Sequence, residues 1–198
     1  MNTSSKFLKR QLADGILNGN GYALDLGCGR GVDALFLARR GYRVEAVEKN
    51  ATHTSTLDEL ARNHNPTVQV FHQKIEEFEI TRQKYSLIIA RNSLSFISDS
   101  ATVMRVVGDM VHGLKPEGML CFTLFGNRDG WSGRTDMSFF AYESIITALE
   151  NLPVSVYYRL SREDFGKTAE GVRKFWHVNT FCYIKTPVAN PRIAALLQ

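Results

Sequence analysis

Three glycines and two carboxylates near the start of the chain form a pattern that could hold a ribose-containing ligand. In the stretch ALDLGCGRGVDALFLARRGYRVEAVEKN, residues 23–50, the glycines Gly27, Gly29 and Gly31 stand at alternate positions. Asp25 precedes them, and Glu48 ends the next apolar run. Glycine lets the backbone approach a ligand closely, and the N-terminus of the following helix offers free N–H groups. A carboxylate at the position of Glu48 can accept hydrogen bonds from both hydroxyls of a ribose.

The glycine spacing separates two classes of ligand. A nicotinamide dinucleotide is typically held by G-x-G-x-x-G, with its pyrophosphate at the helix N-terminus. The spacing here is G-x-G-x-G, and Asp25 in front of the turn suits an ammonium group better than a pyrophosphate. The pattern therefore favours a ligand with an amino-acid end and a ribose end. The alternative is a structural turn that only packs a helix on a strand.

The segments around this turn alternate between expected strands and expected helices. Short apolar or β-branched runs predict strands, and apolar positions at helical spacing predict helices. The expected strands are 22–27, 42–48, 67–73, 85–90 and 118–125, and the expected helices are 1–19, 32–41, 51–65, 98–114 and 139–152. Such alternation predicts an α/β fold with a parallel sheet and helices on both faces.

The last third of the chain has a different texture. A long polar loop is expected over 126–138, and two strands, 154–160 and 174–185, flank a polar segment, 161–173, that we expect to be a loop. Two strands with no helix between them are expected to pair as an antiparallel hairpin. The sheet should therefore end with one reversed strand.

Composition and charge exclude several classes of protein. The 198 residues suit one domain, and a net charge of +4 without a basic stripe argues against a nucleic-acid partner. The three cysteines, Cys28, Cys121 and Cys182, show neither a disulfide framework nor zinc spacing, so we expect no metal and a cytoplasmic location. No apolar run is long enough to predict a membrane helix, and the N-terminus lacks a signal-peptide pattern.

Three of these stretches together resemble the class I S-adenosylmethionine (SAM)-dependent methyltransferases. They are LDLGCGRG with Glu48 downstream, YSLIIARNSLSFI, and LKPEGMLCF, and the resemblance covers residues 20–126. It implies a Rossmann-like three-layer sandwich with a seven-stranded, mostly parallel sheet whose last strand is antiparallel and lies beside the fifth. It also implies a single domain over 1–198, comprising an N-terminal helix (1–19), a cofactor-binding half (20–126), a substrate-side half (127–186) and a C-terminal tail (187–198).

The C-terminal part resembles a narrower subgroup related to tellurite-resistance methyltransferases, which act on small molecules. The stretches that carry this finer resemblance are GNRDGW and GKTAEGVRKFWHV. Phe175 departs from the subgroup pattern, where a histidine often stands.

The family resemblance implies a set of cofactor-binding residues. Asp25 and the backbone of the glycine turn would hold the methionine end of SAM, Glu48 the ribose, and Ile75 the adenine edge. Lys74 stands where many members carry an aspartate, so Glu76 is a possible substitute for the adenine amine. The full set is Asp25, Gly27, Cys28, Gly29, Glu48, Lys49, Ile75, Arg91 and Asn92.

The acceptor is expected beyond the carboxyl ends of the parallel strands, where the loops after the fourth and fifth strands and the closing hairpin form a rim. The candidate substrate residues there are Ser95, Phe96, Trp131, Arg134 and Trp176, and Arg162 is a further candidate for an anionic acceptor. His177 is the candidate base. Strand alternation points Trp176 and His177 to opposite faces, so we expect only one of them to line the pocket. For both tryptophans and for the histidine, ordinary packing is the alternative.

The resemblance implies an enzyme that transfers a methyl group from SAM to a small-molecule acceptor by in-line displacement and leaves S-adenosylhomocysteine (SAH). A general base is needed only if the acceptor carries a proton at neutral pH. The alternatives are a nucleic-acid or protein methyltransferase and a non-catalytic SAM-binding protein. We expect no membrane partner, and either a monomer or a homodimer.

Overall fold

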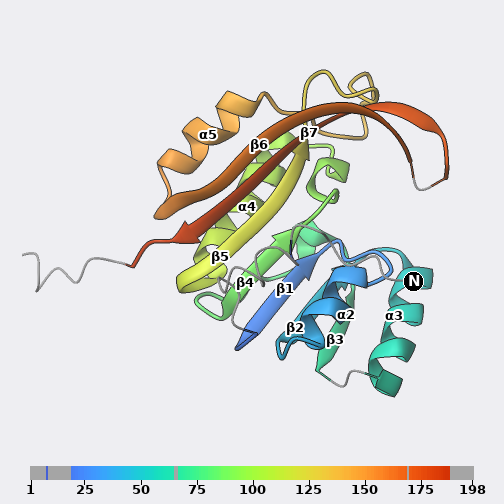
Figure 1. Ribbon diagram of the computed structural model, residues 1–198, viewed down its shortest axis with the longest axis vertical. Coiled ribbons are helices and arrows are strands. Elements are labelled where there is room, and N and C mark those ends of the chain that lie inside the picture. The colour runs from blue at the N-terminus through green and yellow to red at the C-terminus, as the bar shows by residue number, and fades with distance from the viewer. Residues whose placement is uncertain (1–7, 9–18, 65–66, 169, 188–198) are drawn as a thin grey trace, which may run out of the picture.

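The fold is built on one seven-stranded sheet. The computed structural model describes residues 8, 19–64, 67–168 and 170–187. The strand order is β3-β2-β1-β4-β5-β7-β6 (Figure 1). The strands are β1 (Tyr22–Leu26), β2 (Arg43–Glu48), β3 (Val68–His72), β4 (Tyr85–Ala90), β5 (Leu114–Phe125), β6 (Val154–Lys167) and β7 (Arg173–Lys185). The strands β1 to β5 pair in parallel, whereas β7 lies between β5 and β6 and is antiparallel to both. This confirms the predicted α/β sandwich with a seven-stranded sheet and a reversed last strand.

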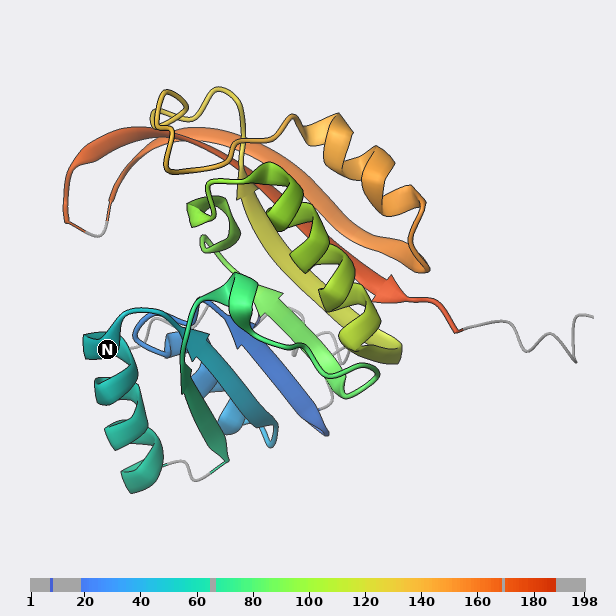
Figure 2. The same cartoon turned by 180° about the vertical axis from the view of Figure 1, so that it is seen from behind.

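Helices cover both faces of the sheet and make the three layers. The helices are α2 (Val32–Ala38), α3 (Ala51–His64), α4 (Ser100–Gly113) and α5 (Tyr142–Glu150). Figure 2 shows α4 and α5 side by side over β4, β5 and the β6–β7 hairpin. Two apolar cores result, one containing residues of α4 and α5 and the other containing residues of α2 and α3. Within β1, Ala23 belongs to one core and Leu24 to the other, which explains why the central strands are apolar without alternation.

Local sequence signals set the ends of these helices. Asn50 caps α3, because its side-chain Oδ1 accepts a hydrogen bond from the backbone N–H of His53 at 3.1 Å. Asp99 caps α4 and accepts from the N–H of Thr102 at 2.8 Å. At its other end α4 stops at Gly113, as the sequence predicts.

The closing hairpin is longer than predicted. We expected residues 161–173 to form a polar loop, but this prediction was wrong. Strand pairing continues from Val154↔Lys185 to Lys167↔Arg173, so most of that segment is strand. Both strands run on past the end of β5 and curve at their far end (Figure 1). The polar composition reflects solvent exposure of this ribbon on both sides rather than a lack of regular structure.

Two further predictions fall on segments that the structure does not describe. The expected N-terminal helix over 1–19 and the expected tail over 187–198 lie almost entirely outside the described residues. Within the described ranges, no helix has the length and apolar character to cross a membrane.

Candidate active site

The glycine turn after β1 leaves open space where a ligand could lie. Gly27, Gly29 and Gly31 all have positive φ, which a side chain would strain. At Gly27 an added Cβ would come within 2.3 Å of the Cβ of Ser93, so this glycine is needed for packing. At Gly29 an added Cβ would meet no atom within 4 Å, and this residue lines a cavity. Gly29 therefore keeps a space open beside the turn.

The backbone N–H groups of the turn are already used within the protein. Gly27 and Cys28 both donate to the carbonyl of Val47, at 2.8 and 3.0 Å. Gly29 donates to Oε2 of Glu48 at 2.9 Å. The turn is thus tied to the end of β2, and what it offers a ligand is its carbonyls and its open space.

Glu48 is held in place by the backbone on both sides. Its Oε2 accepts from the N–H of Gly29, and its Oε1 accepts from the N–H of Asn50, each at 2.9 Å. The side chain is half-buried and lines the same cavity as Gly29. A carboxylate oxygen can accept more than one hydrogen bond, so this fixed group can also accept from a pair of ribose hydroxyls.

Asp25 is a buried carboxylate with one unsatisfied oxygen. The residue is 3% exposed, and its Oδ2 has no hydrogen-bond partner among the described residues. Burial, and secondarily the nearby charge of Asp33, raises the pKa of Asp25 to about 8. Such an oxygen, directly before the glycine turn, fits the ammonium group of an amino-acid ligand.

One cavity of about 720 Å³ joins Gly27, Gly29 and Glu48 to the predicted acceptor side, whereas the buried Asp25 does not line it. It extends from the glycine turn to the β6–β7 hairpin, and its size falls in the range of small-molecule sites. Ten residues predicted for the cofactor or the acceptor line it: Gly27, Gly29, Glu48, Lys49, Ile75, Asn92, Phe96, Trp131, Arg134 and Trp176. Residues from both halves of the chain therefore share one space.

Near the predicted adenine contact, the cavity is lined by Ile75 and Glu76 and not by Lys74. Ile75 and Glu76 both line the cavity and belong to the short 3₁₀ turn Ile75–Glu77. Lys74 does not line it, and its ammonium pairs with Glu77 at 3.2 Å on the exposed surface. Glu76 thus offers a carboxylate to the cavity next to Ile75, and it stays the candidate for the contact that an aspartate makes in many family members.

An aromatic cluster forms the other end of the cavity. Trp131 and Trp176 meet edge to face with 5.3 Å between ring centroids. Phe125 lies 6.0 Å from Trp131 and 5.6 Å from Trp176, and Phe96 lies 6.1 Å from Trp131. The four rings come from the loop after β4, from β5, from the loop after β5 and from β7, so only the folded chain assembles them.

A buried ion pair supports this cluster. The ammonium of Lys174 pairs with the carboxylate of Asp129, and their side chains are 4% and 0% exposed. The carboxylate of Asp129 also accepts from the backbone N–H groups of Trp131 and His177, at 3.0 Å each. Burial lowers the pKa of Lys174 from its ordinary value, while the hydrogen bond to Asp129 opposes that shift. The pair thereby fastens the loop after β5 to β7.

Two predicted residues occupy structural positions instead. Ser95 is 1% exposed, does not line the cavity, and its Oγ accepts from the N–H of Phe125 at 2.9 Å. The expectation that Ser95 touches substrate is therefore corrected, since its hydroxyl ties a loop to β5. His177 is 6% exposed, and its Nδ1 accepts from the N–H of Arg128 at 3.2 Å, while its Nε2 lies 3.1 Å from the hydroxyl of Ser161. As strand alternation predicts, Trp176 lines the cavity and His177 does not.

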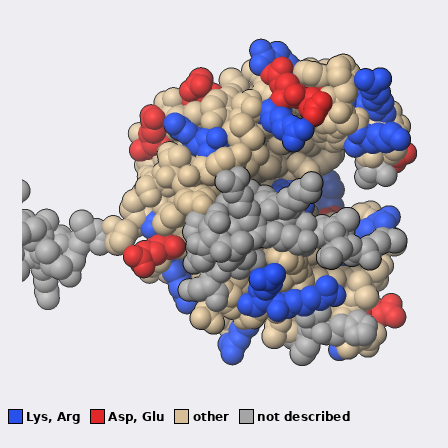
Figure 3. All heavy atoms as spheres, in the orientation of Figure 1, with Lys and Arg blue, Asp and Glu red and all other residues tan. Residues whose placement is uncertain are grey.

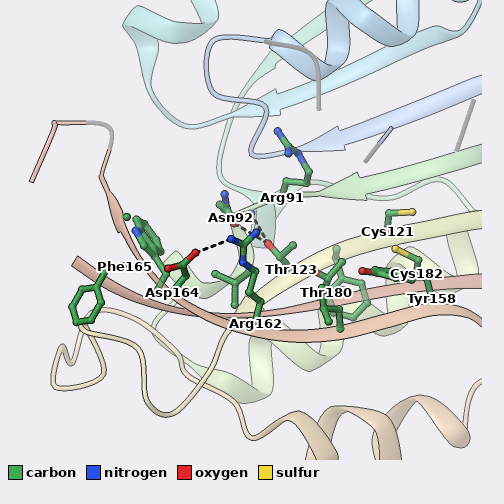
Figure 4. A pocket seen from close by; sticks show the side chains of 15 residues that line it. Arg91, Asn92, Cys121, Thr123, Tyr158, Arg162, Asp164, Phe165, Thr180 and Cys182 are labelled. Atoms are coloured by element: carbon green, nitrogen blue, oxygen red, sulfur yellow. Dashed lines mark hydrogen bonds and ion pairs between the residues drawn. The ribbon is translucent and has the colours of Figure 1, made fainter. Parts of the chain in front are cut away.

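Arg91 and Cys28 also lie apart from the main cavity. Arg91 donates from Nε to Asp33 at 2.6 Å and lines a second, adjoining cavity of about 520 Å³. Figure 4 shows this second cavity with Arg91 and Asn92 at one side and Cys121 and Cys182 at the other. Cys28 is partly buried, and burial raises the pKa of its thiol, so the thiol is protonated at neutral pH.

Asn92 stands between the two cavities and lines both. Its φ is 50°, in the left-handed region that asparagine tolerates better than most residues. Thr123 secures this conformation, because its Oγ1 accepts from the N–H of Asn92 at 2.7 Å and donates to the Asn92 side chain at 3.1 Å. A strained residue held by a side chain at a cavity wall is typical of functional sites.

Sequence reasoning missed several residues at the acceptor end. Phe125, Lys167 and Glu170 line the cavity, and Asp129 with Lys174 supports it from behind. A signal for Lys174 was available, because it precedes Trp176 by two positions on a strand and so shares its face. Asp129 lies within GNRDGW but had no partner that the sequence alone could identify.

Comparison with known proteins agrees with this geometry. Residues 23–118 match the family described as a methyltransferase domain. The chain is 29% identical, over 96 residues, to a ubiquinone biosynthesis O-methyltransferase of Rickettsia akari, which covers 48% of this chain and 37% of that protein. The chain spans less than half the length of the curated relatives it matches.

Several solved structures share this fold. A SAM-dependent methyltransferase from Methanosarcina mazei aligns with a TM-score of 0.70 at 16% identity, over 89% of this chain and 98% of that one. TehB from Haemophilus influenzae aligns with a TM-score of 0.75 at 18% identity, over 93% and 63%. The magnesium protoporphyrin IX methyltransferase from Synechocystis, solved with bound SAM, aligns with a TM-score of 0.66 at 14% identity, over 91% and 76%. The family match over residues 23–118, which includes the glycine turn, and the shared fold show that this chain is similar to the class I SAM-dependent methyltransferases.

Proposed function

We propose that this protein transfers the methyl group of SAM to a small-molecule acceptor that binds against the aromatic cluster. One observation carries the proposal. A single cavity contains Gly29 and Glu48 at one end and Trp131 and Trp176 at the other. Donor and acceptor can therefore lie in one space, which methyl transfer by direct displacement requires.

The residues of the glycine-turn end fit SAM. The open space at Gly29, the fixed carboxylate of Glu48 and the unsatisfied oxygen of Asp25 match the methionine backbone, the ribose hydroxyls and the ammonium. Glu76 is placed to accept from the adenine amine. Bound there, SAM supplies a methyl group that its sulfonium has already activated.

The protein's own contribution is alignment and exclusion of water. Asp25 and Glu48 hold the donor on either side of its sulfonium. Asn92 lines the same cavity as the acceptor wall, which is formed by Phe96, Trp131 and Trp176. Phe96, Trp131 and Trp176 give the acceptor a flat apolar surface. The rings also keep water from the region where the new bond forms.

No general base is assigned. His177 is engaged by Arg128 and Ser161 outside the cavity lining, so its geometry favours the structural role. An acceptor that is already ionised or nucleophilic at neutral pH requires no base. We propose that the acceptor is of that kind.

A thermal-shift titration tests the donor half of the proposal. SAM and SAH are compared with NADH as the control ligand. At about 100 times the dissociation constant, binding contributes about 2.7 kcal/mol of stability, which corresponds to a shift of a few degrees. A shift with SAM and SAH but not NADH is expected, and no shift with either would contradict the proposal. Release of SAH during an acceptor screen then separates an enzyme from a non-catalytic SAM-binding protein.

A further inference from the structure

The ammonium of Lys174 lies inside the aromatic cluster that the proposed function assigns to the acceptor. Its Nζ is 3.7 Å from the ring centroid of Trp176, 4.4 Å from that of Trp131 and 5.3 Å from that of Phe125. All three distances are within the range of a cation–π contact. Lys174 itself does not line the cavity, although all three rings do. The lysine therefore contacts the rings from inside the protein.

An aromatic cage around an ammonium group is the usual means of binding a cationic ligand. Here the protein's own side chain fills that role. The ammonium attracts the π-electrons of both tryptophan rings, and this leaves less attraction for a second cation on the cavity side. The same polarisation favours contact with an electron-rich ring.

A second cation approaches the same wall from the cavity. The guanidinium of Arg134 lies 5.5 Å from the ring centroid of Trp131, and Arg134 lines the cavity. Trp131 therefore has two protein cations within cation–π distance. A cationic acceptor stacked on this ring would meet both of them.

From this arrangement we propose that Lys174 is a specificity-determining residue that lowers the affinity of the acceptor wall for cations. The acceptor is then a planar, electron-rich molecule whose nucleophile is already ionised at neutral pH, as in an aromatic thiolate or an acidic phenol, and not an amine or other cation. This proposal rests on the proposed function, because it concerns the acceptor end of the same cavity.

The test uses two probes that share a phenol ring and differ in the charge of the substituent, 4-hydroxybenzoate and 4-hydroxybenzylamine. The chain contains only two tryptophans, Trp131 and Trp176. The two indole N–H signals in a ¹⁵N-resolved spectrum therefore report directly on the acceptor wall. Each probe is titrated with and without SAH, and no turnover is needed.

Lys174 cannot be neutralised alone without leaving the carboxylate of Asp129 buried and unpaired. The informative variant is therefore the double substitution Asp129→Asn with Lys174→Met. Its matched control is Asp58→Asn with Arg62→Met, which removes an exposed ion pair of α3 at 2.7 Å and, like the double variant, leaves the net charge unchanged. Arg134→Gln tests the second cation at an exposed position, with Arg62→Gln as its control.

In the native protein we expect the benzoate to bind roughly 10-fold more tightly than the benzylamine, the size of a cation–π contribution. The double variant should reduce this ratio to roughly 3-fold or less, and Arg134→Gln should lower it in part. The control variants should keep the native ratio. Equal or tighter binding of the amine by the native protein would overturn the proposal, as would an unchanged ratio in the double variant.

If the double variant does not fold, the native ratio and its response to Arg134→Gln decide the matter. A native preference for the benzoate that Arg134→Gln lowers only in part, or leaves unchanged, leaves Lys174 as its source and supports the proposal. A preference that Arg134→Gln abolishes would trace the selectivity to Arg134 and overturn the proposal. Absence of SAH binding would instead count against the proposed function, because the probe ratio is measured independently of SAH.

Discussion

The Lys174 ammonium stacks on the indole of Trp176 at 3.7 Å while pairing with the buried carboxylate of Asp129. These contacts join the loop after β5 to β7 and set the wall of the cavity. A charged pair at such a position has consequences for stability as well as for specificity.

Lys174→Met alone should lower the free energy of unfolding by about 3–5 kcal/mol, because it leaves Asp129 charged and buried without its partner. The double variant with Asp129→Asn should be less destabilised than either single variant. Urea denaturation of the three variants checks this. A double variant whose loss equals the sum of the two single losses would show that the two groups do not interact.

Glu48→Ala should weaken SAM binding by about 1–3 kcal/mol, since a charged hydrogen-bonding partner of the ribose is lost. Calorimetric titration with SAM measures the change. Glu79→Ala, an exposed glutamate outside the cavity lining, is the control and should bind as the native protein does. An unchanged dissociation constant for Glu48→Ala would remove the ribose assignment.

Gly29→Ala should reduce SAM affinity, because the added methyl group enters the open space beside the turn. The φ of +53° disfavours a side chain, so the variant should also lose about 1 kcal/mol of folding stability. Gly133→Ala is the matched control, because its Cβ would also meet no atom within 4 Å but its φ is not positive. Equal SAM affinity in the two variants would show that the space at Gly29 is not used by the ligand.

Asp25 should make stability and SAM binding depend on pH. Burial raises its pKa from 3.8 to about 8, so the folded protein holds a proton that the unfolded chain releases. The stability from this group is therefore fully present below about pH 4 and is lost as the pH rises toward 8. Asp25→Asn should flatten that decline in urea denaturation between pH 5 and 8.

The same group predicts proton release when SAM binds. An ammonium beside Asp25 favours the charged carboxylate, so at pH 7 binding should expel a proton. Calorimetric titrations in buffers of different ionisation enthalpy measure the number released, and Asp25→Asn should abolish it. Binding without any proton release in the native protein would show that Asp25 does not meet the ammonium.

Trp131→Ala should impair methyl transfer more than SAM affinity, because Trp131 lines the acceptor end of the cavity. Once the screen supplies an acceptor, its KM should rise while the dissociation constant of SAH stays within a few-fold of native. Should the variant instead unfold readily and keep its acceptor KM, Trp131 would be a packing residue. Trp131→Phe should restore part of the acceptor binding, since it retains an aromatic face.

Much of the fold was predictable from the sequence because its signals are local. The apolar runs, the helical spacing, the cap at Asn50 and the stop at Gly113 each depend on a few neighbouring residues. The long ribbon of β6 and β7 was missed for the same reason. Its polar residues do not alternate, and only pairing between distant strands shows that the segment is extended.

The cofactor end of the site was likewise readable, because Gly29 and Glu48 belong to one strand–helix–strand unit with a characteristic spacing. The acceptor end depended on tertiary structure. Phe96 meets Phe125 because β4 pairs with β5, and Trp176 joins them because β7 inserts beside β5. The partnership of Lys174 with Asp129 and the burial of His177 also follow from that insertion, whereas Ser95 is held by the backbone N–H of Phe125 in β5. The chemistry of individual residues was thus visible in the sequence. Which of them share a cavity was decided by contacts between distant segments, and the packing of the sheet creates those contacts.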